Sequence, residues 1–477
     1  MEVSIRPLVA PGAPAGTMRA WVAVLGYGDL PDLAWSVDGA AVAAQPVRPL
    51  RPAYPDAGSL RVATGVVDLT GLPADGRTRT VRVVATSPAT PAGPVPPVAC
   101  ELAMRAVPAE LPGDGTSFNL LLVSCFYRGG DKAGRCGVVA RGLTGLDRPD
   151  LVLTVGDQVY LDQPPLIGSF DDDRLAATFA QKYRDNFVGT DGYAAVLRTA
   201  PVAAIPDDHE YWNNFPHPSP MTLQSLVHRG DIADNPWRRA AKAMYDAFQL
   251  ASADAYSYRF DVAPLSFFMM DNRTFRGTDG KHTLQDADLQ LYRDWVDDVV
   301  ARRLVPVLVT GPSLLQPGKS WWGRLLDRSF ADYGDYGDVM DGLTTLARHG
   351  RGALALTGDV HYGRVVDARI FGTAPEAGTP FGSIREVISS PTALVWGSEH
   401  QRPGTAPTRF APGAAAVKLD TVTAWPGRDD IRGDHVALLR FTRTAGGVAL
   451  EVQYRMIREV HGPGRGTYAL PPVVLPT

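Results

Sequence analysis

Four short apolar segments of the chain each end in polar side chains of the kinds that bind metal ions. A continuous apolar run bounded by turn residues is typical of a strand covered on both faces. The carboxyl ends of such strands meet at one edge of an open α/β sheet, where ligands bind. The segments span residues 119–125, 151–160, 205–210 and 353–361, and they end in Cys125, Asp157 with Tyr160, Asp208 with His209, and Asp359 with His361. The sequence therefore predicts an α/β core with a site at this edge.

The size and composition of the chain limit what it can be. With 477 residues and 45% hydrophobic content it can bury a large core, and two domains are expected. The formal net charge of −4 gives no electrostatic reason to expect a nucleic-acid or membrane partner, so a phosphate ligand needs a local positive site. The three cysteines argue against a disulfide framework, although Cys125 and Cys136 remain able to pair. The oligomeric state stays open.

The cellular location is inferred from targeting signals. The first residues lack a basic region followed by an apolar stretch, and no segment reaches the roughly 18 apolar residues of a membrane span. We therefore expect a soluble, cytoplasmic protein as the sequence stands. A secreted protein is expected only if a leader was removed.

The first 116 residues are predicted to form a small β-sandwich of the immunoglobulin or fibronectin type. Segments rich in Val, Thr and Leu span residues 19–25, 60–69, 78–85 and 98–106. The dipeptides Asp38-Gly39 and Asp75-Gly76 are hairpin turn signals between such segments. A Pro- and Gly-containing stretch at 112–115 marks the boundary, which divides the chain into residues 1–116 and 117–477.

Residues 117–477 alternate strands with helices, which predicts a second domain of the α/β class. Apolar spacing indicates helices at 172–187, 236–250 and 284–303, the last with a capping box formed by Thr283 and Asp286. Further strands are expected at 265–270, 305–310 and 386–389, and a hairpin at 435–457 is expected to extend a sheet. The segment 316–339, which contains Trp321, Trp322, Tyr333 and Tyr336, is expected to form a wall or lid beside the site.

Each candidate ligand also has a structural explanation when it is considered alone. A strand-end aspartate such as Asp157 is often a helix N-cap, and a buried cysteine such as Cys125 is more often a small apolar residue than a ligand. Several carboxylates at one sheet edge repel one another, however, at a cost on the order of several kcal/mol for each close pair even at an effective dielectric constant of about 20. Metal ions remove that repulsion, so the combination favours a metal site.

The strand-end motifs occur in a characteristic order. They are Ser-Cys125, Gly-Asp157-x-x-Tyr160, Asp-Asp208-His209-Glu210, Asp271-x-Arg273, Gly-Asp359-Val-His361 and Ser389-Ser390-Pro391. This order resembles the PhoD family of alkaline phosphatases, within the calcineurin-like metallophosphoesterases. The resemblance extends from about residue 117 to beyond residue 391. It implies a four-layer αββα metallophosphoesterase sandwich, preceded by the small N-terminal β domain, with metal ions at the carboxyl ends of the strands.

The resemblance also implies roles for individual residues. One metal would be held by Cys125, Asp157, Tyr160 and His361, and a second by the bridging Asp157 together with Asp208 and Asp359. His209 would lie beside the phosphate, and Arg273 and Asn214 would contact the substrate. For Arg273, a salt bridge to Asp271 is the structural alternative.

The donor chemistry indicates which metals to expect. The thiolate of Cys125 and the phenolate of Tyr160 suit a highly charged ion such as Fe³⁺, whereas the carboxylate-rich second site suits Ca²⁺, Mg²⁺ or Mn²⁺. We expect Fe³⁺ with Ca²⁺ in a dinuclear or trinuclear cluster. Mn²⁺, Mg²⁺ or Zn²⁺ in a dinuclear site are the alternatives.

These features predict a phosphoric ester hydrolase that acts on a small-molecule monoester or diester through a metal-activated hydroxide. His209 either protonates the leaving group or binds a phosphoryl oxygen. A cysteine hydrolase with Cys125 as its nucleophile is a second hypothesis, although nearby carboxylates would suppress the thiolate. A third hypothesis is a non-catalytic binding module that contains a structural metal.

Overall fold

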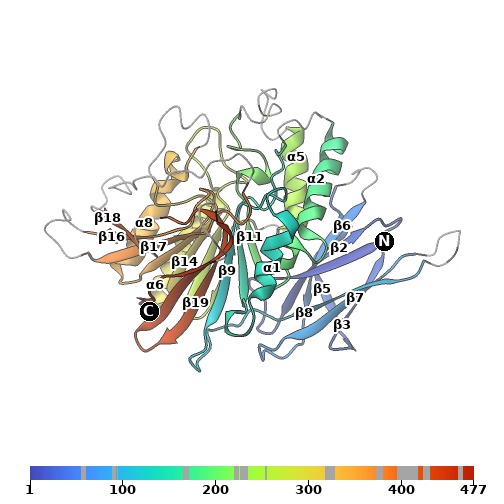
Figure 1. Ribbon diagram of the computed structural model, residues 1–477, viewed down its shortest axis with the longest axis horizontal. Coiled ribbons are helices and arrows are strands. Elements are labelled where there is room, and N and C mark those ends of the chain that lie inside the picture. The colour runs from blue at the N-terminus through green and yellow to red at the C-terminus, as the bar shows by residue number, and fades with distance from the viewer. Residues whose placement is uncertain are drawn as a thin grey trace.

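The described part of the protein is a mixed α/β structure with two large β-sheets, helices on the outer faces of these two sheets, and a smaller third sheet (Figure 1). The computed structural model describes all residues except 55–60, 89–92, 94, 165–170, 220–224, 226–234, 253–254, 317–327, 372–379, 395–416, 423–429, 460–465 and 477. No helix in this part of the chain has the length and apolar character that crossing a membrane requires.

The largest sheet contains eleven strands of the described chain. They are β1 (Glu2–Leu8), β2 (Met18–Leu25), β5 (Ala44–Pro52), β6 (Val62–Leu69), β9 (Phe118–Val123), β10 (Leu151–Val155), β11 (Val202–Ile205), β19 (Gly433–Thr444), β20 (Gly447–Glu459), β21 (Thr467–Ala469) and β22 (Val473–Leu475). Their order is β21-β20-β19-β9-β10-β11-β1-β2-β6-β5, with β22 also paired to β20. β9, β10 and β11 are parallel and buried throughout, as their continuous apolar sequences predict. β19 pairs with β9, so the predicted C-terminal hairpin does extend this sheet.

The second sheet lies opposite the first and contributes the other half of the site edge. It has seven strands among the described residues, in the order β12-β13-β14-β15-β17-β16-β18. These are β12 (Tyr258–Val262), β13 (Leu265–Met270), β14 (Val305–Thr310), β15 (Ala353–Thr357), β16 (Arg364–Ile370), β17 (Gly382–Ile388) and β18 (Val417–Val422). β13, β14, β15 and β17 are parallel, so their carboxyl ends also lie at one edge.

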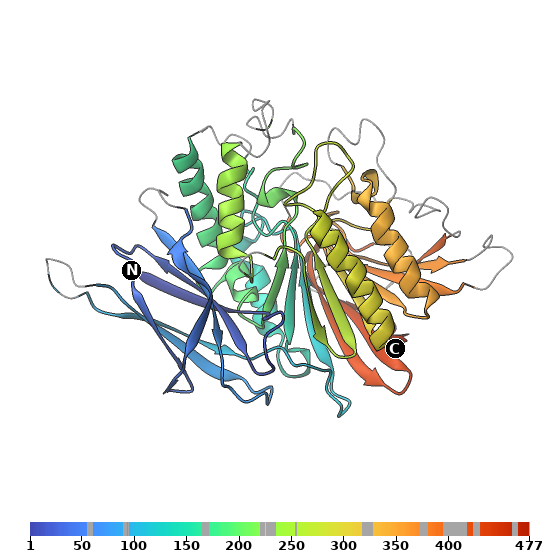
Figure 2. The same cartoon turned by 180° about the vertical axis from the view of Figure 1, so that it is seen from behind.

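The two large sheets pack face to face, and helices cover their outer faces (Figures 1 and 2). The core between the sheets includes Leu122 and Leu153 from the first sheet and Phe267 and Leu356 from the second. The helices α1 (Arg135–Gly142), α2 (Asp172–Phe187), α3 (Gly192–Val196) and α5 (Pro236–Phe248) cover the first sheet. The helices α6 (Asp286–Arg302) and α8 (Asp335–Arg348) cover the second and are yellow and orange in Figure 2. The layers therefore run in the order helix, sheet, sheet, helix.

The N-terminal region packs a third sheet against one end of the first. This sheet has the order β4-β3-β7-β8, formed by β3 (Asp32–Val37), β4 (Ala40–Ala41), β7 (Arg79–Thr86) and β8 (Val98–Met104). Its buried residues share a core with β1, β2 and β6. β1 in turn pairs in parallel with β11 through Leu8 and Val202, so the N-terminal strands continue the large sheet edge to edge. Asp38 and Gly39 both have positive φ in the turn between β3 and β4, as the hairpin signal predicts.

Several local predictions are confirmed, and the predicted capping box is wrong. The bounds of α2, β13 and β14 match the predicted segments. The capping box at Thr283 is wrong, because α6 begins at Asp286 with Gln285 as its N-cap and without a side-chain capping bond. Thr283 instead donates its backbone N–H to Asp335, 2.6 Å away.

The segment 316–339 differs from the predicted wall or lid in its second half. From Asp335 onward it is the helix α8, and Tyr336 packs in the core with its hydroxyl donated to the carbonyl of Leu314. Trp321 and Trp322 lie outside the described residues. The helix forms because the apolar spacing of residues 335–348 places one face against the second sheet.

Candidate metal centre

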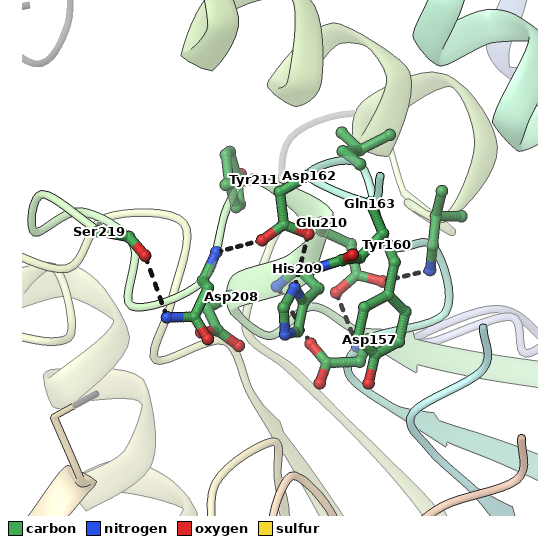
Figure 3. Close-up of polar contacts among 12 residues, drawn as sticks. Asp157, Tyr160, Asp162, Gln163, Asp208, His209, Glu210, Tyr211 and Ser219 are labelled. Carbon is green, nitrogen blue, oxygen red and sulfur yellow. Dashed lines mark hydrogen bonds and ion pairs between the residues drawn. The ribbon is translucent and has the colours of Figure 1, made fainter. Parts of the chain in front are cut away.

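The predicted site residues come from loops at the carboxyl ends of strands in both large sheets. Cys125 follows β9, Asp157 and Tyr160 follow β10, Arg273 follows β13, and Asp359 and His361 follow β15. Asp208 and His209 lie in the short 3-10 helix η3 (Asp208–Glu210) after β11, and Asn214 follows it. In Figure 3, Asp157, Tyr160, Asp208 and His209 lie together above the strand ends. The fold thus brings residues that are up to 236 positions apart in the sequence to one place, from Cys125 to His361.

The residues predicted to hold the first metal contact one another in pairs. The thiol of Cys125 lies 3.4 Å from Oδ2 of Asp157, and the hydroxyl of Tyr160 lies 3.3 Å from Nε2 of His361. Ser390, which the sequence analysis gave no role, donates its hydroxyl to the Cys125 sulfur at 3.1 Å. These contacting pairs supply a thiol, a carboxylate, a phenol and an imidazole, which is a donor set suited to a transition metal.

Two groups of ligand atoms lie close enough to share a metal ion. The groups are Asp157 with Asp208 and His209, and Asp207 with Asp208 and Asp359, and within each group the ligand atoms lie within 4.8 Å of one another. Asp208 belongs to both groups, so two ions bound here would be neighbours. Asp207 was not among the predicted ligands. Its Oδ2 is buried and has no hydrogen-bond partner among the described residues, as expected for an oxygen that accepts a cation.

Burial makes the charged forms of these groups costly. Burial raises the pKa of Asp157 well above its usual range, and the nearby Asp208 raises it further, although His209 opposes both. Burial likewise raises the pKa of Asp207 to about 6, against the lowering effect of Arg273. Burial acts in the same direction on Asp208, but Arg273 and His209 outweigh it and lower the pKa of that carboxyl. Asp157 and Asp207 therefore favour the neutral form unless a further cation lies beside them. The cluster therefore has both the donors and the electrostatic need for metal ions.

The thiol of Cys125 is a poor nucleophile in this environment. Burial raises its pKa well above the ordinary value, and the neighbouring carboxylate of Asp157 raises it further. A thiolate is the reactive form, so these surroundings disfavour a cysteine hydrolase. Cys100, Cys125 and Cys136 are all free thiols, so the pairing of Cys125 with Cys136 that the sequence left open is absent.

His209 is oriented by an aspartate that the sequence analysis missed. Asp162 is 2% exposed, and its Oδ1 accepts the Nδ1–H of His209 at 2.7 Å (Figure 3). Its Oδ2 accepts the backbone N–H of Asn213 at 2.8 Å, which fixes the carboxylate. Burial alone would lower the pKa of His209, but Asp162 and Asp208 outweigh it and raise the pKa well above the usual value. With Nδ1 engaged, Nε2 is the nitrogen available to the cluster.

Arg273 has a different partner from the one that the sequence suggested. Its guanidinium is 1% exposed and forms an ion pair with Oδ1 of Asp207, with Nε at 2.6 Å, and Nη1 donates to the carbonyl of Phe215 at 2.8 Å. Asp271 instead accepts the backbone N–H groups of Arg273 and Thr274. The Nε side of the fork that was predicted to bind phosphate is therefore occupied by Asp207. The structural alternative is correct in that Arg273 forms an ion pair, but its partner is Asp207 and not Asp271.

Glu210 fixes the two central loops to each other. Its carboxylate is 0% exposed and accepts the backbone N–H groups of Asp157, Gln158 and Asp207 at 2.8, 2.6 and 2.9 Å. The last of these bonds is the capping-box bond of η3, for which Asp-x-x-Glu is the sequence signal. Burial raises the pKa of Glu210 to about 7, although these N–H donors lower it. Glu210 thus sets the separation of the loops that carry Asp157 and Asp208.

The backbone of the site is strained where the ligands are. Eight non-glycine residues of the described chain have positive φ, and five of them are predicted site residues: Cys125, Asp157, Asn214, Asp359 and His361. Such conformations cost on the order of 1–3 kcal/mol each and persist where the surrounding structure enforces them. Gly156 shows this enforcement, because a Cβ there would lie 2.3 Å from Cβ of Asp207. The backbone is therefore held in a conformation that aims these side chains at one point.

Comparison with known proteins supports the fold. No protein-family model and no curated protein matches the chain. The solved structure of PhoD matches with a TM-score of 0.61 and 14% identity, covering 97% of this chain and 88% of that one. The structure of GAP50, the anchor in the inner membrane complex of Plasmodium, matches with a TM-score of 0.36 and 10% identity, covering 74% and 89%. The chain therefore has a PhoD-like fold, and the second match is too weak to add to this.

The role of Glu210 leads to a prediction. In Glu210→Gln the amide nitrogen replaces one carboxylate oxygen, so buried N–H groups lose their acceptor and the free energy of unfolding should fall by about 2–5 kcal/mol. Chemical denaturation measures this change. The matched control is Glu386→Gln, since Glu386 is also 0% exposed and accepts the N–H of Leu314 at 2.6 Å in the second sheet. Both variants should lose stability, but only Glu210→Gln should lose metal affinity in the folded protein. Equal metal affinity in the two variants would contradict the anchoring role.

Proposed function

We propose that the protein is a metal-dependent phosphoester hydrolase of the PhoD type, which acts on a small-molecule monoester or diester. The observation that carries the proposal is a pair of overlapping ligand groups, Asp157 with Asp208 and His209, and Asp207 with Asp208 and Asp359. They lie at the edge where the parallel strands of the two large sheets end, and their aspartates are buried except for Asp359, which is half-buried. The helix, sheet, sheet, helix order of the layers supports the αββα sandwich of that family as the finer description of the fold.

The residues present fit a cluster of two or more metal ions. Cys125, Asp157, Tyr160 and His361 would hold the first ion, and Asp157, Asp208 and Asp359 the second. The orphaned Oδ2 of Asp207 adds a further ligand to the second site. Fe³⁺ suits the first donor set and Ca²⁺ the second, with Mn²⁺, Mg²⁺ or Zn²⁺ as alternatives. Bound ions would activate water and neutralise charge on the phosphoryl oxygens.

The side chains of the chain itself divide the remaining tasks. Asp162 holds the imidazole of His209 with Nε2 toward the cluster, where it can donate a proton to the leaving oxygen or bind a phosphoryl oxygen. Asn214 contributes an amide donor, because its Oδ1 accepts the backbone N–H of Arg328 at 2.9 Å and its Nδ2 is left unpartnered. Arg273 acts by holding Asp207 through its guanidinium.

Removal of the bridging ligand tests the metal requirement. Loss of a residue that merely supports a metal ligand costs about 10- to 100-fold in activity. Asp157→Asn should therefore lower kcat/KM for p-nitrophenyl phosphate by about 100-fold or more. The control is Asp185→Asn, an exposed aspartate paired with Arg128 on the surface. Elemental analysis should show metal loss in the first variant alone, and chelation should abolish wild-type activity.

Three results would contradict parts of this account. Near wild-type hydrolysis by Asp157→Asn would contradict the cluster assignment. Metal bound by the wild type without turnover of p-nitrophenyl phosphate or bis-p-nitrophenyl phosphate would favour a non-catalytic binding module. Activity that survives chelation but not alkylation of Cys125 would favour a cysteine hydrolase.

The proton-donor role of His209 leads to a prediction about Asp162. In Asp162→Asn the imidazole loses its charged partner, so its pKa falls and its orientation loosens. If His209 protonates the leaving group, kcat for alkyl phosphates should fall by about 10- to 100-fold, whereas kcat for p-nitrophenyl phosphate should change little because p-nitrophenolate needs no proton. A comparison of rates across leaving groups of different pKa measures this. Equal losses for all leaving groups would instead assign His209 to binding a phosphoryl oxygen.

The identity of the first metal is tested by colour. A phenolate bound to Fe³⁺ gives a charge-transfer band in the visible, which Ca²⁺ and Zn²⁺ cannot give. The iron-loaded protein should therefore be coloured, and Tyr160→Phe should lose the band together with much of the activity, because it removes only the hydroxyl. Elemental analysis serves as the control for iron content. A fully active protein without iron that tolerates Tyr160→Phe would refute both the iron assignment and the ligand role of Tyr160.

A further inference from the structure

Arg276 is a buried cation that lacks hydrogen-bond partners at the end of its side chain. It is 3% exposed and lies in the loop after β13. Its Nε donates to the carbonyl of Asn272 at 3.1 Å, but Nη1 and Nη2 have no hydrogen-bond partner in the described structure. Burying a guanidinium whose N–H donors are unused is costly unless a ligand accepts hydrogen bonds from them. The nearby Arg273 differs in this respect, because Asp207 is its ion-pair partner.

The surroundings of Arg276 are electropositive on one side. Its guanidinium carbon lies 4.8 Å from the ring centroid of Tyr333, whose hydroxyl is 2.8 Å from Nε2 of His217. Burial, together with the charges of Arg328, Arg276 and Arg273, lowers the pKa of His217 to about 3. His217 is therefore neutral. Among the described residues, no carboxylate accepts a hydrogen bond from the side chain of Arg276.

Arg276 also lies within electrostatic range of the acidic cluster. The charges of Asp207 and Asp208 raise its pKa, against the larger lowering effect of burial and the effect of Arg273. The loop that carries Arg276 is also tied to the cluster by hydrogen bonds, because the backbone N–H of Arg276 binds the carbonyl of Arg273 at 3.1 Å and the Arg273 side chain holds Asp207. A group that contacts both metal ions and guanidinium donors binds most strongly when it carries negative charge.

Two amide side chains add to these unused groups. Asn214 is 1% exposed, its backbone N–H binds Oδ2 of Asp208 at 2.5 Å, and its Nδ2 has no partner. The backbone N–H of Arg328 fixes the orientation of that amide by binding its Oδ1. Asn272 is 0% exposed, and neither polar atom of its side chain has a partner in the described chain. Buried polar atoms are rarely left unpaired, so these side-chain atoms, on the loops that carry Asp208 and Arg276, are available to a ligand.

We infer that Arg276, with the amides of Asn214 and Asn272, forms an oxyanion subsite on the Asp208 side of the cluster, and that its ligand is a phosphate group. The planar guanidinium fork matches two oxygens of a phosphate, and the amide nitrogens supply further donors. This inference rests on the proposed function, since it assigns the residues that recognise the anion at the same site. Arg276 takes the phosphate-binding role that the family resemblance implied for Arg273.

The test compares Arg276→Gln with a control that removes another buried arginine. Arg6 is 2% exposed, with Nε and Nη1 unpartnered, and its guanidinium carbon lies 4.2 Å from the ring centroid of Trp21 and 4.8 Å from that of Phe187. Arg6→Gln therefore removes a comparable buried positive charge at a position away from the site. The dissociation constant of inorganic phosphate is measured by calorimetry on metal-loaded proteins whose metal content is checked by elemental analysis.

The expected result is that Arg276→Gln raises the phosphate dissociation constant by about 10- to 100-fold, whereas Arg6→Gln leaves it within about twofold of the wild type. Arg276→Lys, which keeps the charge without the fork, should give an intermediate value. An unchanged dissociation constant in folded Arg276→Gln overturns the subsite, and so does an equal loss in Arg6→Gln.

A second variant keeps the inference testable if Arg276→Gln does not fold. Asn214→Asp preserves size and tolerates the positive φ of 67° at this position, but replaces a donor with a repelling carboxylate oxygen. Phosphate binding should weaken by about 10-fold or more. Unaltered phosphate binding by this variant overturns the subsite.

Two substrates show which phosphate group occupies the subsite: the one that is transferred or a second one on the same molecule. p-Nitrophenyl phosphate carries one phosphate, whereas pyrophosphate carries two. Equal losses of kcat/KM for both in Arg276→Gln place the transferred phosphoryl group in the subsite, and a larger loss for pyrophosphate places the second phosphate there. Unchanged kcat/KM for both overturns the inference. Failure of the proposed function is seen separately: wild-type protein would bind phosphate in an Arg276-dependent manner but hydrolyse no phosphoester.

Discussion

The bonds of the Glu210 carboxylate are the constraint on which the rest of the site depends. One buried side chain accepts N–H groups from both loops that leave β10 and β11, so it fixes the distance between Asp157 and Asp208. Those two carboxylates would otherwise separate, because like charges in a buried site repel one another. Gln249, the residue directly after α5, donates its side-chain amide to Glu210 at 3.3 Å, which links the anchor to the helical layer. The acidic cluster is thus imposed on its members by the scaffold.

The two sheets are joined at the same edge, and this allows strained ligand loops to persist. Ser124 donates its hydroxyl to the carbonyl of Ser389, and Ser389 donates its own to the carbonyl of Leu122. Gly358 permits this approach, because a Cβ there would lie 2.4 Å from Oγ of Ser124. Left-handed backbone at Cys125 and Asp359 sits on either side of that junction. A strain on the order of 1–3 kcal/mol per residue is retained where the surroundings leave no alternative, so the arrangement points to function more than to stability.

The features of the structure that depend on local sequence patterns were predictable. The contacts between residues far apart in the chain were not. The strands that carry Cys125 and Asp157 were predictable because both lie in continuous buried runs ended by turn residues. Predicted metal ligands and His209 do converge, since parallel strands present their carboxyl ends at one edge. The partner of Arg273 was not predictable, because Asp207 is 66 positions away in the chain. Asp162 lies close to Tyr160 in sequence, but only the fold turns it toward His209. The edge-to-edge joining of β1 to β11 likewise has no local signal.

The distribution of unpaired polar atoms explains how a site with so much negative charge can recognise an anion. Oδ2 of Asp207 is an orphaned acceptor that requires a cation, whereas Nη1 and Nη2 of Arg276 are orphaned donors that require an anion. Metal ions bound by the carboxylates would convert the acidic cluster into a positive one, beside the positive charge of Arg276. Bound metal ions then favour the binding of phosphate, and by thermodynamic linkage bound phosphate favours the binding of the metal ions to the same extent. A phosphate group bound with metal ions satisfies both kinds of orphaned atom at once, which neither ligand achieves alone.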